Sequence, residues 1–373
     1  MRTSWRHLAL INAVSFLAQT VQIGTVPPAL ALRLEAAGAS PTSIGCVAAA
    51  PWVAILIFGR GVPAVLNRAG FVTSTLAGLA LSALPLFGMA SVADPLALFG
   101  LNFISGLGLI LRWIACDTWI TAVAPAEIRG RAIGMHETFM GCGIAAGPIV
   151  LAVSRVPLLV CAALLAISAL LLLALWRADV RIRTEVSAMP AHAARGGGLR
   201  MLMAAGALAG LAETSAISFL PLMAQQANWA LGAAAVLFGF GLGGTLLQVP
   251  VGWLADGYGD RIAQRLIGSV VLGGAVAIPF CTAHAGLLAV VLFLWGGAVG
   301  GANTLAVIEA GKRAGMHQVS PAMTAIALAY TVGSIVGPVL VGASQALLPM
   351  FGLAGVVALA AGGFLLMEAR RPG

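Results

Sequence analysis

The chain has 373 residues, of which 60% are hydrophobic and only 9% are charged, whereas a typical soluble domain has roughly 25% charged residues. This composition excludes a soluble globular protein and predicts an integral membrane protein. The net charge of +8 is a feature of some nucleic-acid-binding proteins, but its distribution along the chain follows membrane topology, so we expect no nucleic-acid partner.

Short polar clusters separate apolar runs of about 20 residues, the length that a helix needs to cross a hydrocarbon core of about 30 Å. The strict alternation of a β-barrel is absent, so an all-α membrane protein is expected. The first run is longer than the apolar core of a signal peptide, about 7 to 15 residues, and is taken as the first span. In chain order the runs predict twelve transmembrane helices, near residues 8–32, 41–58, 71–91, 96–121, 132–153, 157–176, 201–224, 233–252, 262–281, 286–307, 321–345 and 348–367.

The basic residues orient these spans. With both termini on one side, seventeen of the twenty basic residues fall in loops on that side, two (Arg33 and Arg155) fall on the opposite side, and Arg112 lies inside a span. Cytoplasmic loops carry the excess of Lys and Arg. We therefore expect both termini to be cytoplasmic, in the cytoplasmic (inner) membrane of a bacterium.

The longest polar stretch combines charges, a proline and three glycines, which is typical of a linker. It divides the chain into an N-terminal six-helix bundle (1–176), a cytoplasmic linker (177–200) and a C-terminal six-helix bundle (201–373).

Two sets of markers recur in both halves at nearly the same separation. One set follows the second and eighth helices at a separation of 189 residues, and the other lies in the fifth and eleventh helices at a separation of 190. This regularity predicts a duplicated unit and two pseudo-symmetric bundles. The pairs are Asn67 with Asp256, Gly70 with Gly259, Gly143 with Gly333, Gly147 with Gly337, and Pro148 with Pro338.

The stretch "GWLADGYGDR" (252–261) resembles the cytoplasmic signature of the major facilitator superfamily. Its signature residues are Gly252, Asp256, Gly259 and Arg261. The first-half copy, which also contains Arg68, keeps Gly70, has Asn67 for the aspartate, and departs at Pro63 and Phe71. The resemblance implies the major facilitator fold and secondary active transport by alternating access, with these residues in gating. It also implies no cofactor, a small-molecule substrate, the lipid bilayer and protons as partners, and a monomer.

The segment Gly134–Pro148 is similar to the fifth-helix motif that this family associates with exporters exchanging against protons, although Leu151 and Ala152 replace its closing glycines. More finely, residues 117–137 with 243–261 resemble a branch of small bacterial facilitators labelled as efflux or uncharacterised transporters. Gly143 and Gly147 share a helix face, which favours close packing, and Pro148 favours a kink. Plain tight packing and a hinge both remain open.

Ionisable residues inside spans need a partner or a wet cavity, because a charge there costs about 2.5–3.5 kcal/mol on insertion scales. Glu213 lies about 18 Å into its helix at about 1.5 Å per residue, near the midplane, and is the first candidate for a proton carrier; the alternative is a protonated acid bonded to a neighbouring helix. The candidates for proton coupling are Glu213, Glu137, Asp117, His136 and Arg112, with Glu309 near the cytoplasmic end of its helix.

Asp117, His136 and Glu137 lie within two turns of cytoplasmic helix ends, where they favour either a gate and charge network or a proton relay. Arg112 resembles the fourth-helix arginine of family exporters; otherwise it neutralises Asp117 or Glu137.

Mid-span polar residues are candidates for lining a substrate cavity, and interhelical hydrogen bonding is the alternative for each. Gln19 and Gln22 lie three residues apart and share a helix face. The candidates are Gln19, Gln22, Arg112, Glu213, Gln248, Asn303 and Tyr330.

Enzyme chemistry has little support. "HETFM" lacks the second histidine of a zinc-protease helix, and the only lysine, Lys312, is in no phosphate-binding loop, so no metal and no cofactor are expected. The sequence favours a proton-coupled exporter, an antiporter for efflux of a small amphipathic or apolar molecule. The alternatives are a proton-independent facilitator or importer of a metabolite, and a non-transporting membrane sensor or scaffold.

Overall fold

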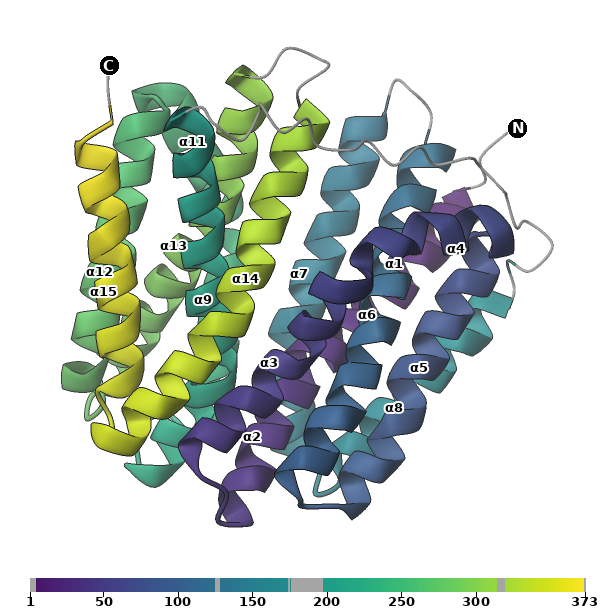
Figure 1. Cartoon of the computed structure of the whole chain (residues 1–373), viewed down its shortest axis with the longest axis horizontal. Coiled ribbons are helices and arrows are strands. Elements are labelled where there is room, and N and C mark those ends of the chain that lie inside the picture. Colours follow the sequence, from purple (N-terminus) through teal and green to yellow (C-terminus); the bar gives the residue numbers. More distant parts are fainter. Residues whose placement is uncertain (1–4, 125–127, 174, 176–196, 314–318, 372–373) are drawn as a thin grey trace. The chain divides into compact units, whose positions relative to one another are not determined.

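The computed structural model describes residues 5–124, 128–173, 175, 197–313 and 319–371 (Figure 1). Within these residues the regular secondary structure is helical, without strands. Ten helices of this described part are long and apolar enough to cross a membrane, and a bent pair makes an eleventh span. Pro157–Leu173 has 17 residues, close to the shortest stretch of about 17 that spans a bilayer, and is the twelfth. Most of the predicted linker lies outside the described residues.

The helices group into two compact units, and each is described by itself. Unit 1 comprises residues 1–33 and 50–186, and unit 2 comprises 34–49 and 187–373. The first half of the chain contains α1 (Trp5–Gln19), η1 (Thr20–Thr25), α2 (Val26–Ala36), α3 (Pro41–Phe58), η2 (Gly59–Gly61), α4 (Val62–Ala69), α5 (Phe71–Ser91), α6 (Pro95–Val123), α7 (Arg129–Val153) and α8 (Pro157–Leu173).

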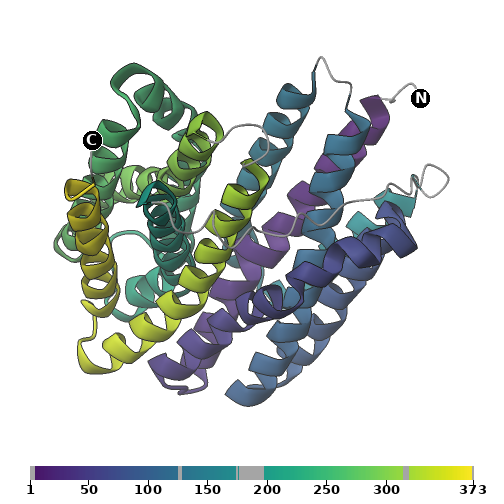
Figure 2. The same ribbon diagram turned by 45° about the horizontal axis from the view of Figure 1, so that its top comes forward.

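The second half contains α9 (Gly197–Gln226), α10 (Ala233–Leu246), α11 (Gln248–Tyr258), α12 (Asp260–Cys281), α13 (Ala285–Arg313), α14 (Val319–Leu347) and α15 (Gly352–Ala369). Helices α9 and α14 pack side by side in unit 2 (Figures 1 and 2). Residues 34–49 group with unit 2 because α3 meets α14 closely: a Cβ atom at Gly45 would lie 2.1 Å from the Pro338 carbonyl oxygen.

The first predicted span is not a uniform α-helix, because residues Thr20–Thr25 form a π-helix. Pro27 and Pro28 follow directly, and they lack the N–H groups that would bond to the carbonyls of Ile23 and Gly24. The Val26 N–H bonds instead to the carbonyl of Val21, five residues back. Two adjacent prolines were the available sequence signal for this irregularity.

The predicted span 233–252 is likewise broken, since α10 and α11 meet at an angle of 42° around Leu247. Pro250 has no N–H to bond to the carbonyl of Leu246, and the Gln248 side-chain amide donates to the carbonyl of Gly244. Both features weaken the helical ladder at one place, which accounts for the bend.

The duplicated loop glycines have the same backbone conformation. Gly70 has φ 84° and Gly259 has φ 85°, in the region that favours glycine. Gly70 separates α4 from α5, and Gly259 separates α11 from α12. The repeat seen in the sequence therefore corresponds to one local geometry used twice.

The glycines of α7 and α14 allow close backbone contact with the first helix of their own unit. A Cβ atom at Gly143 would lie 2.4 Å from the Phe16 carbonyl oxygen, and one at Gly147 would lie 2.2 Å from the carbonyl carbon of Gly24. In unit 2, a Cβ at Gly333 would lie 2.1 Å from the Ala207 carbonyl oxygen. Tight packing of the glycine face, one of the two readings open from the sequence, is thus present in both units.

Gly147→Ala is expected to lower the thermal unfolding temperature in detergent, because the added methyl has no room against Gly24; overpacking of this kind costs about 1–3 kcal/mol. Gly134→Ala is the matched control on the same helix, since nothing lies within 4 Å of its Cβ position. Equal unfolding temperatures for the two variants would contradict the close contact.

Candidate functional site

A buried arginine organises the polar interior of unit 1. Arg112, on α6, is 0% exposed. Its Nη2 donates to Oε1 of Gln19 and to Oε1 of Gln22, both at 2.8 Å, and its Nε donates to Oε1 of Gln22 at 3.1 Å. Two carboxamides that the sequence placed on one helix face therefore bind one guanidinium.

The second carboxamide group continues this network. Gln22 Nε2 donates to Ser82 Oγ on α5 at 2.6 Å, and Ser82 Oγ donates to the Ser105 carbonyl at 3.2 Å. The π-helix that carries Gln22 is fixed by Thr25, whose hydroxyl donates to the carbonyls of Thr20 at 2.7 Å and Gly147 at 3.0 Å. Among the described residues Arg112 forms no ion pair with Asp117 or Glu137, and its hydrogen bonds go to neutral amide oxygens.

His136 forms a second polar centre in unit 1. Its Nδ1 lies 2.7 Å from Oδ1 of Asn12 on α1, and its Nε2 lies 3.2 Å from Oδ1 of Asp117 on α6. The structure thus brings together Asp117 and His136, which the sequence placed close to each other. Glu137 is exposed and is in no ion pair of the described part of the chain. Asn12 was missed from sequence.

In unit 2, Glu213 of α9 is bonded across to α14. The Tyr330 hydroxyl donates to Glu213 Oε2 at 2.8 Å, and Glu213 is in no ion pair with a described residue. Two candidates chosen separately from the sequence therefore form one pair. Gln248 accepts from the Thr304 hydroxyl on α13, whereas the neighbouring Asn303 is partly exposed.

A charge network lies at the end of unit 2 where α12 begins and α13 and α15 end. Glu309 and Glu368 are both 0% exposed, and Arg371 binds each of them, with Nη1 3.3 Å from Glu368 Oε2. Gln264 Nε2 donates to Glu309 Oε2 at 2.6 Å, and Arg261 Nη2 donates to the Arg371 carbonyl at 2.7 Å. The structure therefore places the signature residue Arg261 in a network with the chain's C-terminal segment.

Burial alone would lower the pKa of the Arg371 guanidinium, but the hydrogen bonds and charges of Glu309 and Glu368 raise its pKa above the ordinary value. Beside this network, Lys312 bridges Asp256 at 3.1 Å and Asp260 at 3.0 Å. The sequence did not identify Glu368, Arg371 or Gln264. The spacing of three residues between Glu368 and Arg371 was an available signal, whereas Gln264 and Arg371 are 45 and 62 residues from Glu309 and show no pattern.

Membrane-spanning helices with internal polar pairs and a duplicated loop geometry define the chain as a polytopic membrane protein of transporter type. The family model of the Major Facilitator Superfamily matches residues 8–338, so the chain belongs to this superfamily and is a transporter of that class. It is 24% identical over 351 residues to the uncharacterised MFS-type transporter YfkF of Bacillus subtilis (strain 168), covering 89% of this chain and 86% of that protein.

Solved structures show the same fold. The chain superposes on a mutant of the nucleoside transporter NupG with a TM-score of 0.79 at 15% identity, covering 96% of this chain and 99% of that one. A bacterial homologue of the human lysosomal transporter Spinster, in an inward-facing and unoccupied conformation, gives a TM-score of 0.74 at 12% identity, covering 99% and 94%. At these identities the likeness concerns the fold alone.

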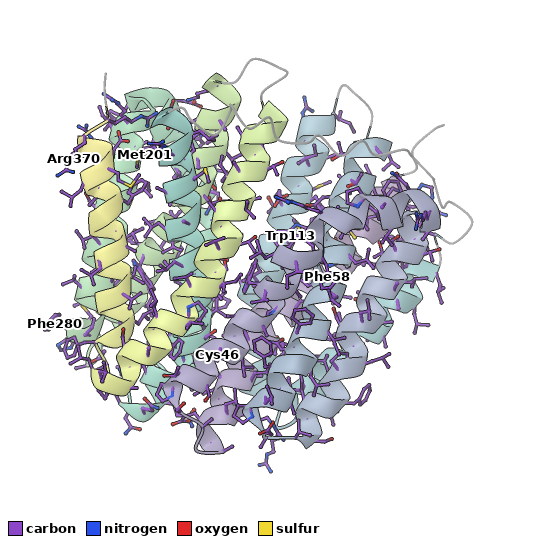
Figure 3. The ribbon with its side chains drawn as sticks, in the orientation of Figure 1. Cys46, Phe58, Trp113, Met201, Phe280 and Arg370 are labelled. Carbon is purple, nitrogen blue, oxygen red and sulfur yellow. The ribbon has the colours of Figure 1, made fainter. Side chains whose placement is uncertain are left out.

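Arg371→Ala is expected to destabilise unit 2 strongly, since removing one partner of a buried ion pair costs about 3–5 kcal/mol. Arg370→Ala is the matched control, because Arg370 is exposed at the end of α15 (Figure 3). Thermal unfolding in detergent measures the difference.

The raised pKa of Arg371 keeps its charge below about pH 12, so the arginine itself should contribute no pH dependence at neutral pH. Similar unfolding temperatures for the two variants would show that the network adds no stability.

Proposed function

We propose that this transporter exports a small amphipathic or apolar molecule in exchange for protons, by alternating access in the bacterial inner membrane. Both termini are cytoplasmic in this proposal, and the protein acts as a monomer. The observation that carries it is the pair Glu213 and Tyr330, a carboxyl group deep in an apolar span whose hydrogen-bond donor is a neutral hydroxyl.

The absence of a cation beside Glu213 in the described part of unit 2 supports proton exchange. An ionised carboxylate in an apolar span is costly unless a positive charge or water compensates it. A permanent ion pair would fix the charge through the whole cycle. A hydroxyl partner accommodates both forms of the carboxyl group, because it donates to the carboxylate and accepts from the acid.

The burial of Arg112 supports an uncharged or cationic substrate rather than an anionic one. Its guanidinium is fully buried and already bonded to Gln19 and Gln22. Of its nitrogens Nη1 has no hydrogen-bond partner among the described residues, and this atom is buried as well. The mid-span partners of the described helices are otherwise amides and hydroxyls, which suits a substrate that is largely apolar.

The proposal predicts that Glu213→Gln uncouples transport from protons. A thermal-shift screen of the purified protein against apolar and amphipathic compounds identifies a ligand, since binding to the folded state raises apparent stability. In proteoliposomes containing a pH-sensitive dye, protons moving down an imposed proton gradient should drive that ligand across the membrane in the opposite direction, and an imposed ligand gradient should drive protons the opposite way. Glu213→Gln should keep exchange of labelled for unlabelled ligand and lose the proton movement.

Two further variants make this test specific. Tyr330→Phe keeps the carboxyl group and should retain coupling, and Glu35→Gln makes the same change at a partly exposed end of α2 and should behave as wild type. Wild-type flux that ignores the pH gradient would favour the facilitator or importer, and unchanged proton movement in Glu213→Gln would exclude Glu213 as the carrier.

A further inference from the structure

Three helices of unit 1 meet at one imidazole ring. His136 comes from α7 and is 1% exposed, and its two ring nitrogens face Asn12 on α1 and Asp117 on α6. Each nitrogen has one neighbour and both neighbours present oxygen atoms. The ring therefore joins α1, α6 and α7 through a single side chain.

The number of hydrogens at this site follows from the atoms that face each other. An amide oxygen only accepts, so the nitrogen that lies 2.7 Å from Asn12 Oδ1 must carry a hydrogen. A neutral imidazole has a single ring hydrogen, which leaves Nε2 as a bare acceptor. Nε2 then faces a carboxylate oxygen at 3.2 Å, and two acceptors repel unless one additional proton lies between them.

We propose that His136 and Asp117 form a one-proton site, positioned by Asn12, and that loss of its proton opens the contact between α6 and α7. The site lies at the end of unit 1 that the sequence predicts to be cytoplasmic. It concerns unit 1 alone and does not depend on proton exchange at Glu213. Asn12 acts as the positioning residue, because its oxygen fixes which nitrogen is left to share the proton.

Access to the proton is one-sided. The Asp117 side chain is 38% exposed, whereas that of His136 is 2% exposed. A proton therefore enters and leaves through the carboxylate and not past Asn12, which is itself buried. When the proton is absent, repulsion between Nε2 and Oδ1 acts directly across the two helices.

Among the described side chains, His136 is the one that lies within hydrogen-bonding distance of the Asp117 carboxylate. Arg112 acts on Asp117 through space, but its guanidinium donates to Gln19 and Gln22 instead of the acid. Glu137 also interacts electrostatically with Asp117, and its side chain is exposed. The remaining titratable or charged side chains of the described parts of α1, α6, α7 and α8 are Arg6, His7, Cys116, Arg131, Cys142 and Cys161.

Imidazole ¹⁵N NMR of the full-length protein tests the site directly, because the chain has only five histidines and His136→Gln assigns the signal. Spectra are recorded between about pH 5 and about pH 9, which brackets the ordinary pKa of histidine. At the acidic end both nitrogens of His136 should carry hydrogen. As pH rises Nε2 should lose its hydrogen, and amide hydrogen exchange in the first turns of α7 should accelerate by about tenfold or more.

Three variants separate the proton site from a merely structural contact. In Asp117→Asn the amide donates to bare Nε2, so the ring should stay neutral and the exchange of α7 should no longer depend on pH. In Asn12→Asp a second carboxylate favours the doubly protonated ring, so the opening should move to higher pH. Glu137→Gln removes the neighbouring carboxyl group that interacts with Asp117, and a pH dependence of α7 that persists in this variant shows that Glu137 is not the group responsible.

Two outcomes overturn the proposal. A wild-type ring with a bare Nδ1 throughout would mean that the Asn12 amide donates and that no additional proton is held. Opening of α7 that occurs at the same pH in wild type and Asp117→Asn would show that another group titrates. If Asp117→Asn does not fold, the direction of the shift in Asn12→Asp still decides, since only a proton at Nε2 moves the opening to higher pH.

Discussion

A polar group inside these spans must find its partner within the protein, because hydrocarbon offers neither donors nor acceptors. Arg112 shows the consequence most clearly. Its guanidinium is fully buried, and Nε and Nη2 donate to Gln19 and Gln22 on a stretch of helix that departs from α geometry. Through the π-helix both carboxamides accept from the same guanidinium, and the Thr25 hydroxyl in the π-helix donates to the Gly147 carbonyl on α7. The demand for partners thus shapes the backbone as well as the side chains.

The same demand is met by different chemistry in the two halves of the repeat. Phe71 and Trp119 in unit 1 stack with ring centroids 5.9 Å apart, whereas the residues 190 positions later, Arg261 and Glu309, belong to the charge network of unit 2. The glycine contacts are kept: Gly143 meets Phe16, and Gly333 meets Ala207. The repeat therefore conserves close backbone approach and allows the polar interior to diverge between the halves.

Composition and spacing were enough to predict the all-helical membrane fold, and most helix boundaries fall within a few residues of their predicted places. Gln19 with Gln22 and Asp117 with His136 were expected near one another, because a short separation on a helix and a short loop both limit distance. The π-helix and the bend at Leu247 were missed, since apolar runs are read as regular helices. The contacts of Asn12 with His136 and of Arg371 with Glu309 were missed for another reason: contacts over separations of 124 and 62 residues leave no pattern in a single sequence.

The divergence of the two halves bears on the proposal that Glu213 exchanges a proton. The glycine contacts align Phe16 with Ala207, a separation of 191 residues, and the same separation aligns Gln22 with Glu213. The position that faces Gln22 is Arg112, and 190 residues later the chain has Ala302. An arginine at position 302 would pair with Glu213 and keep it ionised, in the place where Arg112 donates hydrogen bonds to Gln22. Alanine at 302 provides no cation for Glu213, whose hydrogen-bond donor is the Tyr330 hydroxyl, and this supports the proposal that Glu213 carries the exchanged proton.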